Sequence, residues 1–327
     1  MKVKFLIIRL SSIGDIVLTS PVVRCLKQQV EGAEIHFVTK EKHTCIVDSN
    51  PHISKVYLLK DKLLPLLEEL EKEQFDYIID LHQNIRSNRI KQRLKIPAFA
   101  FHKLNYQKWM LVNLKINVLP NLHIVDRYMD TLRVFEVEND GKGLDYFMSK
   151  KPQFDFSSLP VLFQNGYIAF VIAGTYPTKC LPNEKVITIC NKVGKPVILL
   201  GGKNEVENAS YIVENSSGNI HNLCGKTELN ESSQIIKKAR IVLSNDTGLM
   251  HVAAAFKKKI LSFWGNTIPE FGMYPYQTEP SSKIMEIKGL RCRPCSKLGY
   301  DKCPKKHFKC MMDIDVNEVV EWVNENY

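Results

Sequence analysis

The chain has 327 residues, of which 44% are hydrophobic, and it carries a formal net charge of +10 at pH 7. No uncharged stretch reaches the roughly 18 residues that a membrane-spanning helix needs. The apolar run at the N-terminus is short and is interrupted by Arg9, which argues against a cleavable signal peptide. We therefore expect a cytoplasmic protein of two domains. Its positive charge favours an acidic partner, such as a nucleotide, an anionic lipid surface or nucleic acid.

The first half of the chain alternates short apolar runs with helical patterns. The apolar runs have the length of buried strands, and they are Phe5–Ile8, Ile35–Val38, Val56–Leu59 and Tyr77–Leu81. Helical patterns such as Pro65–Lys72 separate them. This alternation predicts a parallel sheet that is covered by helices on both faces.

A loop of small residues follows the first predicted strand, and Asp15 begins the next helix. The segment Arg9–Pro21 has the sequence RLSSIGDIVLTSP, so it lacks the G-x-G-x-x-G pattern of dinucleotide-binding proteins. Two interpretations of Asp15 stay open. Its carboxylate either stabilises the N-terminus of the helix through the helix dipole, or acts as a catalytic base at the carboxyl end of a strand.

A strongly basic segment lies between residues 86 and 115. Its cations are Arg86, Arg89, Lys91, Arg93, Lys95, Lys103, Lys108 and Lys115. The aromatic residues among them are Phe99, Phe101, Tyr106 and Trp109. Such a mixture can bind nucleic acid, and it also suits an acceptor that bears carboxylates and phosphates. The alternative is a solvated basic face.

The alternating pattern stops at residues 139–166, which have loop composition, and resumes at Ile168. We expect one domain over residues 1–150, a second over 151–312, and a C-terminal helix over 313–327. The predicted strands of the second domain are Ile168–Ile172, Val197–Leu200, Ile241–Leu243 and Ile260–Phe263. Polar or glycine-rich turns follow the first three of these strands, at Ala173–Lys179, Gly201–Glu205 and Ser244–Asp246. Three such turns at one sheet edge would enclose a single site.

The third of these turns has the clearest chemistry. Asp246, Thr247 and Gly248 precede an alanine-rich helix, whose N-terminus offers free N–H groups to an anion. Gly248 lets the backbone approach a phosphate closely, and His251 lies five residues beyond Asp246. The alternative is that Asp246 is only the N-cap of the helix. Asp-Thr-Gly is also the aspartic protease tripeptide, but a helix is the wrong setting for it.

The other two turns supply one charged side chain each. Lys179 could sit against a phosphate as a point charge. Glu205 could accept a hydrogen bond from a ribose hydroxyl. Together with the third turn, they indicate a nucleotide site.

The C-terminal region contains a cluster of cysteines and a final helix. The cysteines are Cys292, Cys295, Cys303 and Cys310, with His307 among them. They could bind a structural zinc ion, or they could be four reduced cysteines that pack an irregular loop; we expect no catalytic metal. In the final segment, Asp315 begins a pattern that resembles a capping box. An apolar stripe at helical spacing follows, formed by Val316, Val319, Val320 and Val323.

Two motifs resemble the signatures of glycosyltransferase family 9, the ADP-heptose:lipopolysaccharide heptosyltransferases. They are Arg9–Pro21 and Asn245–His251. The resemblance implies an α/β protein of GT-B fold, in which two Rossmann-like domains with mostly parallel sheets face one another across a cleft. The N-terminal domain would bind the acceptor and the C-terminal domain the nucleotide-sugar, and the last helix would pack back on the N-terminal domain. The resemblance also implies an inverting transfer without a metal or another cofactor.

The resemblance assigns roles to individual residues. Asp15 would be the general base, and Lys179, with Thr175 and Thr178 nearby, would hold the diphosphate. The residues that would line the donor phosphates, heptose and ribose are Asp246, Thr247, Gly248, His251 and Glu205. Apart from the resemblance, the charge of the basic segment leads us to expect that Arg86, Arg89 and Arg93 contact an anionic acceptor. The chain departs from the family at Cys180–Leu181, where an aromatic residue is usual, and at Trp264, where phenylalanine is usual.

The expected function follows from these assignments. The chain would move heptose from ADP-heptose to a lipopolysaccharide-core acceptor of the lipid A–Kdo type, at the cytoplasmic face of the inner membrane. The alternative is a basic protein that binds nucleic acid or a membrane and retains a vestigial sugar-nucleotide site. The enzyme is favoured, and nucleic acid is disfavoured as a partner, because Asp15, Lys179, Asp246 and His251 are all present.

Overall fold

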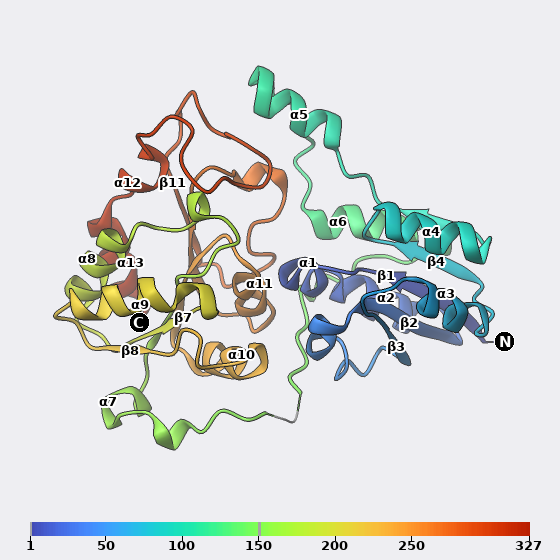
Figure 1. The fold of residues 1–327 in the computed structure, drawn as a ribbon, viewed down its shortest axis with the longest axis horizontal. Helices are drawn as coiled ribbons and strands as arrows, with labels where there is room; N and C mark the ends of the chain where they lie inside the picture. The colour runs from blue at the N-terminus through green and yellow to red at the C-terminus, as the bar shows by residue number, and fades with distance from the viewer. Residues whose placement is uncertain (1, 150–151) are drawn as a thin grey trace. The chain divides into compact units, whose positions relative to one another are not determined.

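A computed structural model describes residues 2–149 and 152–327 of the chain (Figure 1). The chain forms two compact units. Unit 1 contains the residues up to Lys103 together with Leu122–Ser149, and unit 2 contains Leu104–Asn121 together with the rest of the chain. The predicted domain boundary at residues 150 and 151 lies outside the described residues.

Unit 1 is built on a five-stranded parallel sheet with the strand order β3-β2-β1-β4-β5. Its strands are β1 (Val3–Ile8), β2 (Ala33–Lys40), β3 (Lys55–Leu59), β4 (Tyr77–Asp80) and β5 (Ala98–Ala100). Its helices are α1 (Ile13–Val17), α2 (Ser20–Gln29), α3 (Leu64–Glu71), α4 (Ile85–Leu94) and α6 (Ile124–Met129), with 3-10 turns η1 (Glu41–Ile46) and η2 (Asp130–Phe135). The apolar run Phe5–Ile8 is fully buried, because β1 is the central strand. The four strands predicted from the sequence are confirmed, and β5 is added at the edge.

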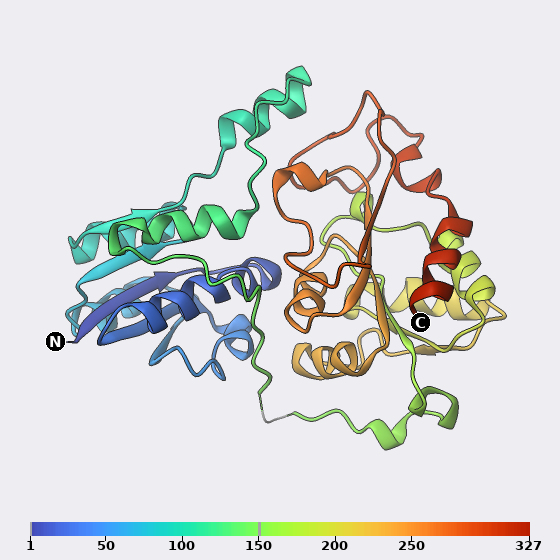
Figure 2. The ribbon, with the colours of Figure 1, turned by 180° about the vertical axis from the view of Figure 1, so that it is seen from behind.

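Unit 2 is built on a six-stranded parallel sheet with the strand order β11-β10-β9-β6-β7-β8. Its strands are β6 (Ile168–Val171), β7 (Val197–Leu200), β8 (Ile220–Asn222), β9 (Ile241–Asn245), β10 (Lys259–Trp264) and β11 (Lys283–Glu286). Its helices are α5 (Asn105–Leu114), α7 (Val161–Gln164), α8 (Asn183–Val193), α9 (Val206–Glu214), α10 (Leu229–Lys238), α11 (Gly248–Ala255), α12 (Lys309–Met312) and α13 (Val316–Asn326). Its 3-10 turns are η3 (Phe156–Ser158), η4 (Pro177–Lys179), η5 (Lys203–Glu205) and η6 (Pro269–Phe271). Figure 2 shows α8, α9 and α13 on one side of this sheet and α10 and α11 on the other.

The final helix, α13, packs inside unit 2. Its apolar stripe, which we expected to pack on the N-terminal domain, is buried in the core of unit 2, where α13 lies against α8. The reason is that α8 turns an apolar face of Val186, Ile189 and Val193 to the same core. Residues of unit 2 alone are thus enough to bury the apolar stripe of α13.

Helix α5 also belongs to unit 2, although residues of unit 1 flank it in the sequence. Its Leu111 forms a small apolar cluster with Ile268 and Phe271. This packing divides the basic segment that we identified in the sequence, because α4 belongs to unit 1 and α5 to unit 2.

No helix in residues 2–149 and 152–327 combines the length and the apolar character needed to cross a membrane. Helices α8 and α13 have 11 residues each. Such a helix is about 17 Å long at a rise of 1.5 Å per residue, well below the roughly 30 Å of a bilayer core.

Candidate functional site

The candidate functional residues lie beyond the carboxyl ends of the strands in both sheets. Because every strand pair is parallel, the loops after neighbouring strands lie at one edge of their sheet, where α/β proteins bind ligands. The unit 1 edge consists of Arg9, Ser12, Asp15, His82 and Tyr128. The unit 2 edge consists of Lys179, Glu205, Asn245, Asp246, Thr247 and Thr267.

Asp15 is held by three groups at the unit 1 edge. Its Oδ1 lies 2.7 Å from Nη2 of Arg9. Its Oδ2 accepts hydrogen bonds from the backbone N–H of Ser12 at 3.0 Å and from the Ser12 hydroxyl at 2.8 Å. The contact with the Ser12 N–H is the helix-start role that we left open, since it satisfies a donor at the N-terminus of α1. The side chain remains 21% exposed, so a ligand can still reach it.

Arg9 is fixed at several points besides Asp15. Its guanidinium donates to the carbonyl oxygens of Ser11 and Leu81 and, at 3.0 Å, to the Tyr128 hydroxyl. The side chain of Arg9 also lies over the Tyr128 ring. A planar guanidinium can hold several acceptors at once, so Arg9 is a rigid support for Asp15.

The pKa of Asp15 is lowered below its ordinary value. Burial on its own would raise this pKa, but the charge of Arg9 and the hydrogen bonds from Ser12 outweigh it. Asp15 is therefore a carboxylate at neutral pH, in the ionisation state that a general base requires.

His82 is a functional candidate that the sequence analysis missed. It follows β4 by two residues, beside the Leu81 carbonyl that holds Arg9. Burial, followed by the charges of Arg9 and Lys103, lowers the pKa of His82 to about 4, so the imidazole is neutral at pH 7. Its Nδ1 is buried without a hydrogen-bond partner in the described part of the chain. Its position after the strand next to β1 is the only sequence signal that could have indicated it.

Helix α4 carries the three arginines predicted to bind the acceptor. Arg86 lies in its first turn and Arg89 one turn further, and both are exposed. Arg93 lies about 10 Å beyond Arg86 along the helix, and its Nε is 2.7 Å from Oε1 of Glu71. Arg86 is therefore nearer than Arg93 to the unit 1 edge.

Lys91, on the same helix, has a structural role. Its Nζ lies 2.8 Å from Oδ2 of Asp80, which is fully buried. The other oxygen of Asp80 accepts from the backbone N–H groups of His82 and Gln83. This pair fixes the turn between β4 and α4.

At the unit 2 edge, Asp246 lies at the centre of a charged cluster. Lys179 Nζ is 2.5 Å from Oδ2 of Asp246. The Thr267 hydroxyl donates to the same oxygen at 3.0 Å. The three residues follow the neighbouring strands β6, β9 and β10, so the sheet itself brings them together. The side chain of Lys179 is 17% exposed, which leaves its ammonium group accessible to a ligand.

Asn245 clamps the loop that carries Lys179. Its side-chain oxygen accepts from the Leu181 N–H at 3.0 Å, and its amide nitrogen donates to the Ile172 carbonyl at 2.9 Å. Both ends of the loop after β6 are thereby tied to the last residue of β9. The sequence by itself predicts no role for Asn245.

The two threonines predicted near Lys179 have different environments. Thr178 is 3% exposed, and its hydroxyl both accepts from the N–H of Tyr300 and donates to its carbonyl. This hydroxyl is thus engaged within the protein. Thr175 is exposed, and no partner of its side chain is found in the described residues.

The remaining predicted donor residues lie around the same edge. Glu205 accepts from the Gly202 N–H at 2.7 Å, which orders the turn after β7. Thr247 is the N-cap position of α11 and Gly248 is its first residue, and both are partly exposed. The N–H groups of this helix start are therefore accessible to an anion. His251 is buried in the first turn of α11.

The C-terminal cysteines do not form a metal site in this structure. Cys292 Sγ lies 3.8 Å from His307 Nε2. No group of three or more His, Cys, Asp or Glu side chains in the described chain is arranged to share a metal ion. Burial raises the pKa of Cys295 to about 11 and that of Cys310 to about 12, which favours the protonated thiols.

The sequence of this chain matches a known protein family. Residues 63–302 match the family described as glycosyltransferase family 9 (heptosyltransferase). A curated relative, lipopolysaccharide heptosyltransferase 1 of Campylobacter coli, is 27% identical over 289 residues, which cover 81% of this chain and 84% of the relative.

Solved structures share the fold over nearly the whole length. A glycosyl transferase family 9 protein of Veillonella parvula matches with a TM-score of 0.76 at 19% identity, over 98% of this chain and 97% of that one. An E. coli heptosyltransferase with ADP matches with a TM-score of 0.69 at 20% identity, over 99% of this chain and 100% of that one. The α/β fold with two parallel sheets, expected from the sequence, is therefore confirmed.

Proposed function

The chain belongs to glycosyltransferase family 9, and we propose that it moves heptose from ADP-heptose to an anionic acceptor of the lipopolysaccharide-core (lipid A–Kdo) type by an inverting, metal-independent displacement. The observation that carries the proposal is the unit 2 edge, where a partly exposed lysine and a partly exposed helix N-terminus follow neighbouring parallel strands. This combination suits a diphosphate. A related protein is known with ADP, which supports the choice of nucleotide.

Each of the donor residues binds a different part of the nucleotide-sugar. Lys179 and the N–H groups at Thr247 and Gly248 stabilise the diphosphate as it leaves. Asp246 accepts hydrogen bonds from sugar hydroxyls when Lys179 turns to the phosphates. Glu205 has one carboxylate oxygen engaged by Gly202 and offers the other to the ribose. Thr175 reaches the phosphates as an exposed hydroxyl, whereas Thr178 holds the loop and His251 supports α11 from within.

Asp15 takes the proton of the attacking acceptor hydroxyl. The carboxylate is ionised and is held in one orientation by Arg9 and Ser12, so the base is aligned before the substrate arrives. As the new glycosidic bond forms, the hydroxyl proton passes to Asp15 while the C–O bond to the diphosphate breaks. The neutral His82 lies at the same edge and can hydrogen-bond the acceptor.

The exposed arginines of α4 attract the anionic acceptor electrostatically. Arg86 and Arg89 are exposed cations at the start of the helix, and they suit the phosphates or carboxylates of a glycolipid. Arg93 is engaged by Glu71 and contributes less. These charges also favour an anionic membrane surface, which would place the enzyme at the cytoplasmic face of the inner membrane.

A transfer assay tests the proposed function. The protein is incubated with ADP-heptose and with a lipopolysaccharide core that lacks heptose, and the glycolipid is analysed by mass spectrometry. The expected result is the addition of one heptose, with no addition from UDP-glucose or GDP-mannose. Transfer from UDP-glucose or GDP-mannose but not from ADP-heptose would keep the fold and overturn the donor. The absence of transfer from any donor would overturn the function.

A further inference from the structure

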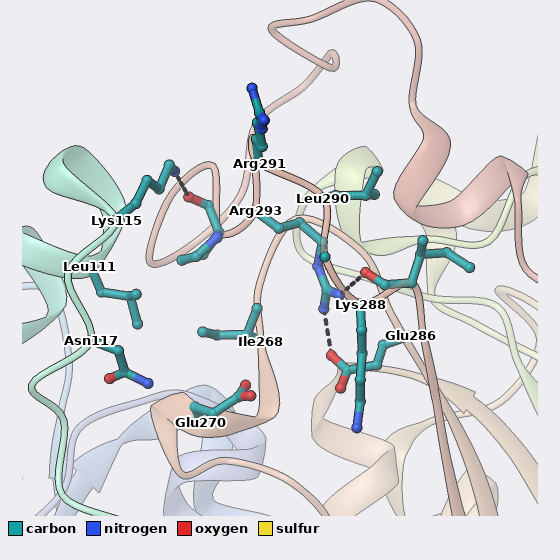
Figure 3. A pocket seen from close by; sticks show the side chains of 13 residues that line it. Leu111, Lys115, Asn117, Ile268, Glu270, Glu286, Lys288, Leu290, Arg291 and Arg293 are labelled. Carbon is teal, nitrogen blue, oxygen red and sulfur yellow. Dashed lines mark hydrogen bonds and ion pairs between the residues drawn. The ribbon is translucent and has the colours of Figure 1, made fainter.

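A pocket of about 620 Å³ lies in unit 2, apart from the residues assigned to the donor. Its walls come from α5, from the turn after β10 and from the loop after β11. Figure 3 shows Leu111 and Ile268 facing each other across it, with Asn117 and Glu270 at one end and Lys288 near Arg293 on the far side. We call it the α5 pocket.

The strand order places the pocket relative to the residues assigned to the nucleotide. Strands β6, β7 and β8 lie on one side of β9, and β10 and β11 lie on the other. The residues assigned to the nucleotide, Lys179 and Glu205, follow β6 and β7, whereas the walls of the α5 pocket follow β10 and β11. The pocket therefore lies on the side of Asp246 opposite to Lys179 and Glu205.

Arg293 connects the pocket with the donor edge. Its guanidinium donates to the Thr267 carbonyl at 2.8 Å and to Oε2 of Glu286 at 2.9 Å. The Thr267 hydroxyl in turn holds Asp246 at 3.0 Å. The side chain of Arg293 is 5% exposed, and its Nε is buried without a hydrogen-bond partner among the described residues. One wall of the pocket is thus fixed to the residue that positions the donor carboxylate.

Some charged side chains that line the pocket are paired within the protein, and others are free to contact a ligand. Arg293 neutralises Glu286, and Lys115 donates to the carbonyl oxygens of Val112 at 2.9 Å and Pro294 at 2.7 Å. Two exposed cations, Lys288 and Arg291, have no partner in the described part of the chain. Figure 3 shows Lys288 beside the pocket and Arg291 directed away from it, at the rim. Lys288 is therefore the cation that an occupant meets.

The lining suits a sugar that carries an anion. The apolar side chains of Leu111 and Ile268 can pack against ring carbons, and exposed Glu270 and Asn117 can hydrogen-bond hydroxyl groups. Lys288 then faces the carboxylate or phosphate. A neutral sugar would give the ammonium group of Lys288 no anionic partner.

We infer that the α5 pocket is a subsite for an anionic sugar residue of the acceptor, with Lys288 as its charge-recognising residue. The assignment of that sugar to the acceptor rests on the proposed function. Binding of an anionic sugar in the pocket can be measured without any transfer.

The test uses saturation-transfer NMR on the full chain with three probes. Methyl glucuronide carries a carboxylate, glucose 1-phosphate carries a phosphate, and methyl glucoside carries neither. Wild type is compared with Lys288→Glu and with a matched control, Lys302→Glu, which changes an exposed lysine outside the pocket. We expect wild type and Lys302→Glu to bind an anionic probe, and Lys288→Glu to bind it at least about tenfold more weakly.

The three probes separate the sources of the anion. Preference for methyl glucuronide identifies a sugar acid, and preference for glucose 1-phosphate identifies a sugar phosphate. The inference is overturned if methyl glucoside binds as tightly as both anionic probes, or if Lys288→Glu binds them like wild type. An unchanged thermal shift with ADP in Lys288→Glu shows that its unit 2 is folded.

The failure of this inference differs from the failure of the proposed function. If wild type transfers heptose and Lys288→Glu shows an unchanged KM for the acceptor, the subsite is wrong and the function stands. If no heptose is transferred but anionic sugars bind in a manner that depends on Lys288, the pocket stands and the function fails.

Discussion

The unit 1 edge and the unit 2 edge use the same pair of charges in different ways. Each has a carboxylate that follows an interior strand, Asp15 after β1 and Asp246 after β9, and each carboxylate is paired with a cation. Arg9 also donates to two backbone carbonyls and to Tyr128. Lys179, in contrast, donates a hydrogen bond to Asp246, which is the one partner of its ammonium group found among the described residues.

This difference in anchoring separates two kinds of function. An arginine held at several points cannot leave its carboxylate, so Asp15 stays ionised and oriented, as a base should be. A lysine is a point charge on a flexible stem, so Lys179 can turn from Asp246 to an anionic ligand. We therefore assign proton transfer to the unit 1 edge and diphosphate binding to the unit 2 edge.

The largest expected effect comes from Asp15→Asn. The amide keeps the size of the side chain but cannot take a proton, so transfer should fall by about 10²- to 10⁴-fold. Product is measured by mass spectrometry under initial-rate conditions. Asp61→Asn, at an exposed position of unit 1, is the matched control and should retain full activity. An Asp15→Asn enzyme as fast as wild type would remove the unit 1 edge from the mechanism.

The next largest effect is expected for Lys179→Met. Without the ammonium group, no positive charge offsets the carboxylate of Asp246, which then repels the diphosphate. The Kd for ADP should therefore rise by about 10- to 100-fold. The measurement is the increase in Tm on addition of ADP, which should shrink. Lys179→Arg restores the charge and should recover part of the increase. An undiminished increase in Lys179→Met would contradict the assignment of the donor site.

A third prediction concerns the pH dependence of transfer in Arg9→Gln. Burial raises the pKa of Asp15 and the charge of Arg9 lowers it, so removal of that charge raises the pKa. Asp15 then becomes protonated, and transfer is lost, at a higher pH than in wild type. The profile of kcat/KM between pH 4 and 8 should show its acid limb displaced upward. An acid limb at the same pH in both proteins would mean that Arg9 does not control this carboxylate.

The smallest effect is expected for Thr267→Val. The substitution removes one hydrogen bond to Asp246 and keeps the ion pair with Lys179. A typical hydrogen bond contributes about 0.5–1.5 kcal/mol net, and the ion pair with Lys179 still holds Asp246, so kcat/KM should fall by about two- to twelvefold. Steady-state kinetics with ADP-heptose measure this loss. A loss as large as that of Lys179→Met would show that Thr267, and not Lys179, is the main support of the unit 2 edge.

The sheet and its loops could be predicted because they depend on short-range pattern. Apolar runs of three to five residues mark the buried strands in the sequence, and parallel order then places Lys179 and Asp246 at one edge. The same reasoning could not reveal how Arg9 is anchored, since the Leu81 carbonyl and the Tyr128 hydroxyl are distant in the sequence.

Other features depended on packing that one sequence does not encode locally. Thr178 is a plausible phosphate ligand by position, but its hydroxyl is taken by Tyr300. The spacing of the cysteines fits zinc, yet the fold of their loop does not bring three ligands together in the described residues. Helix α5 packs in unit 2 because Leu111 meets Ile268 and Phe271, and its position in the sequence gives no sign of this.

The most direct test of the division between the two edges is calorimetric titration of ADP into wild type, Asp15→Asn and Lys179→Met side by side. We predict the same Kd for wild type and Asp15→Asn, and a Kd about 10- to 100-fold higher for Lys179→Met. Equal weakening by the two substitutions, or weakening by Asp15→Asn alone, would contradict this prediction.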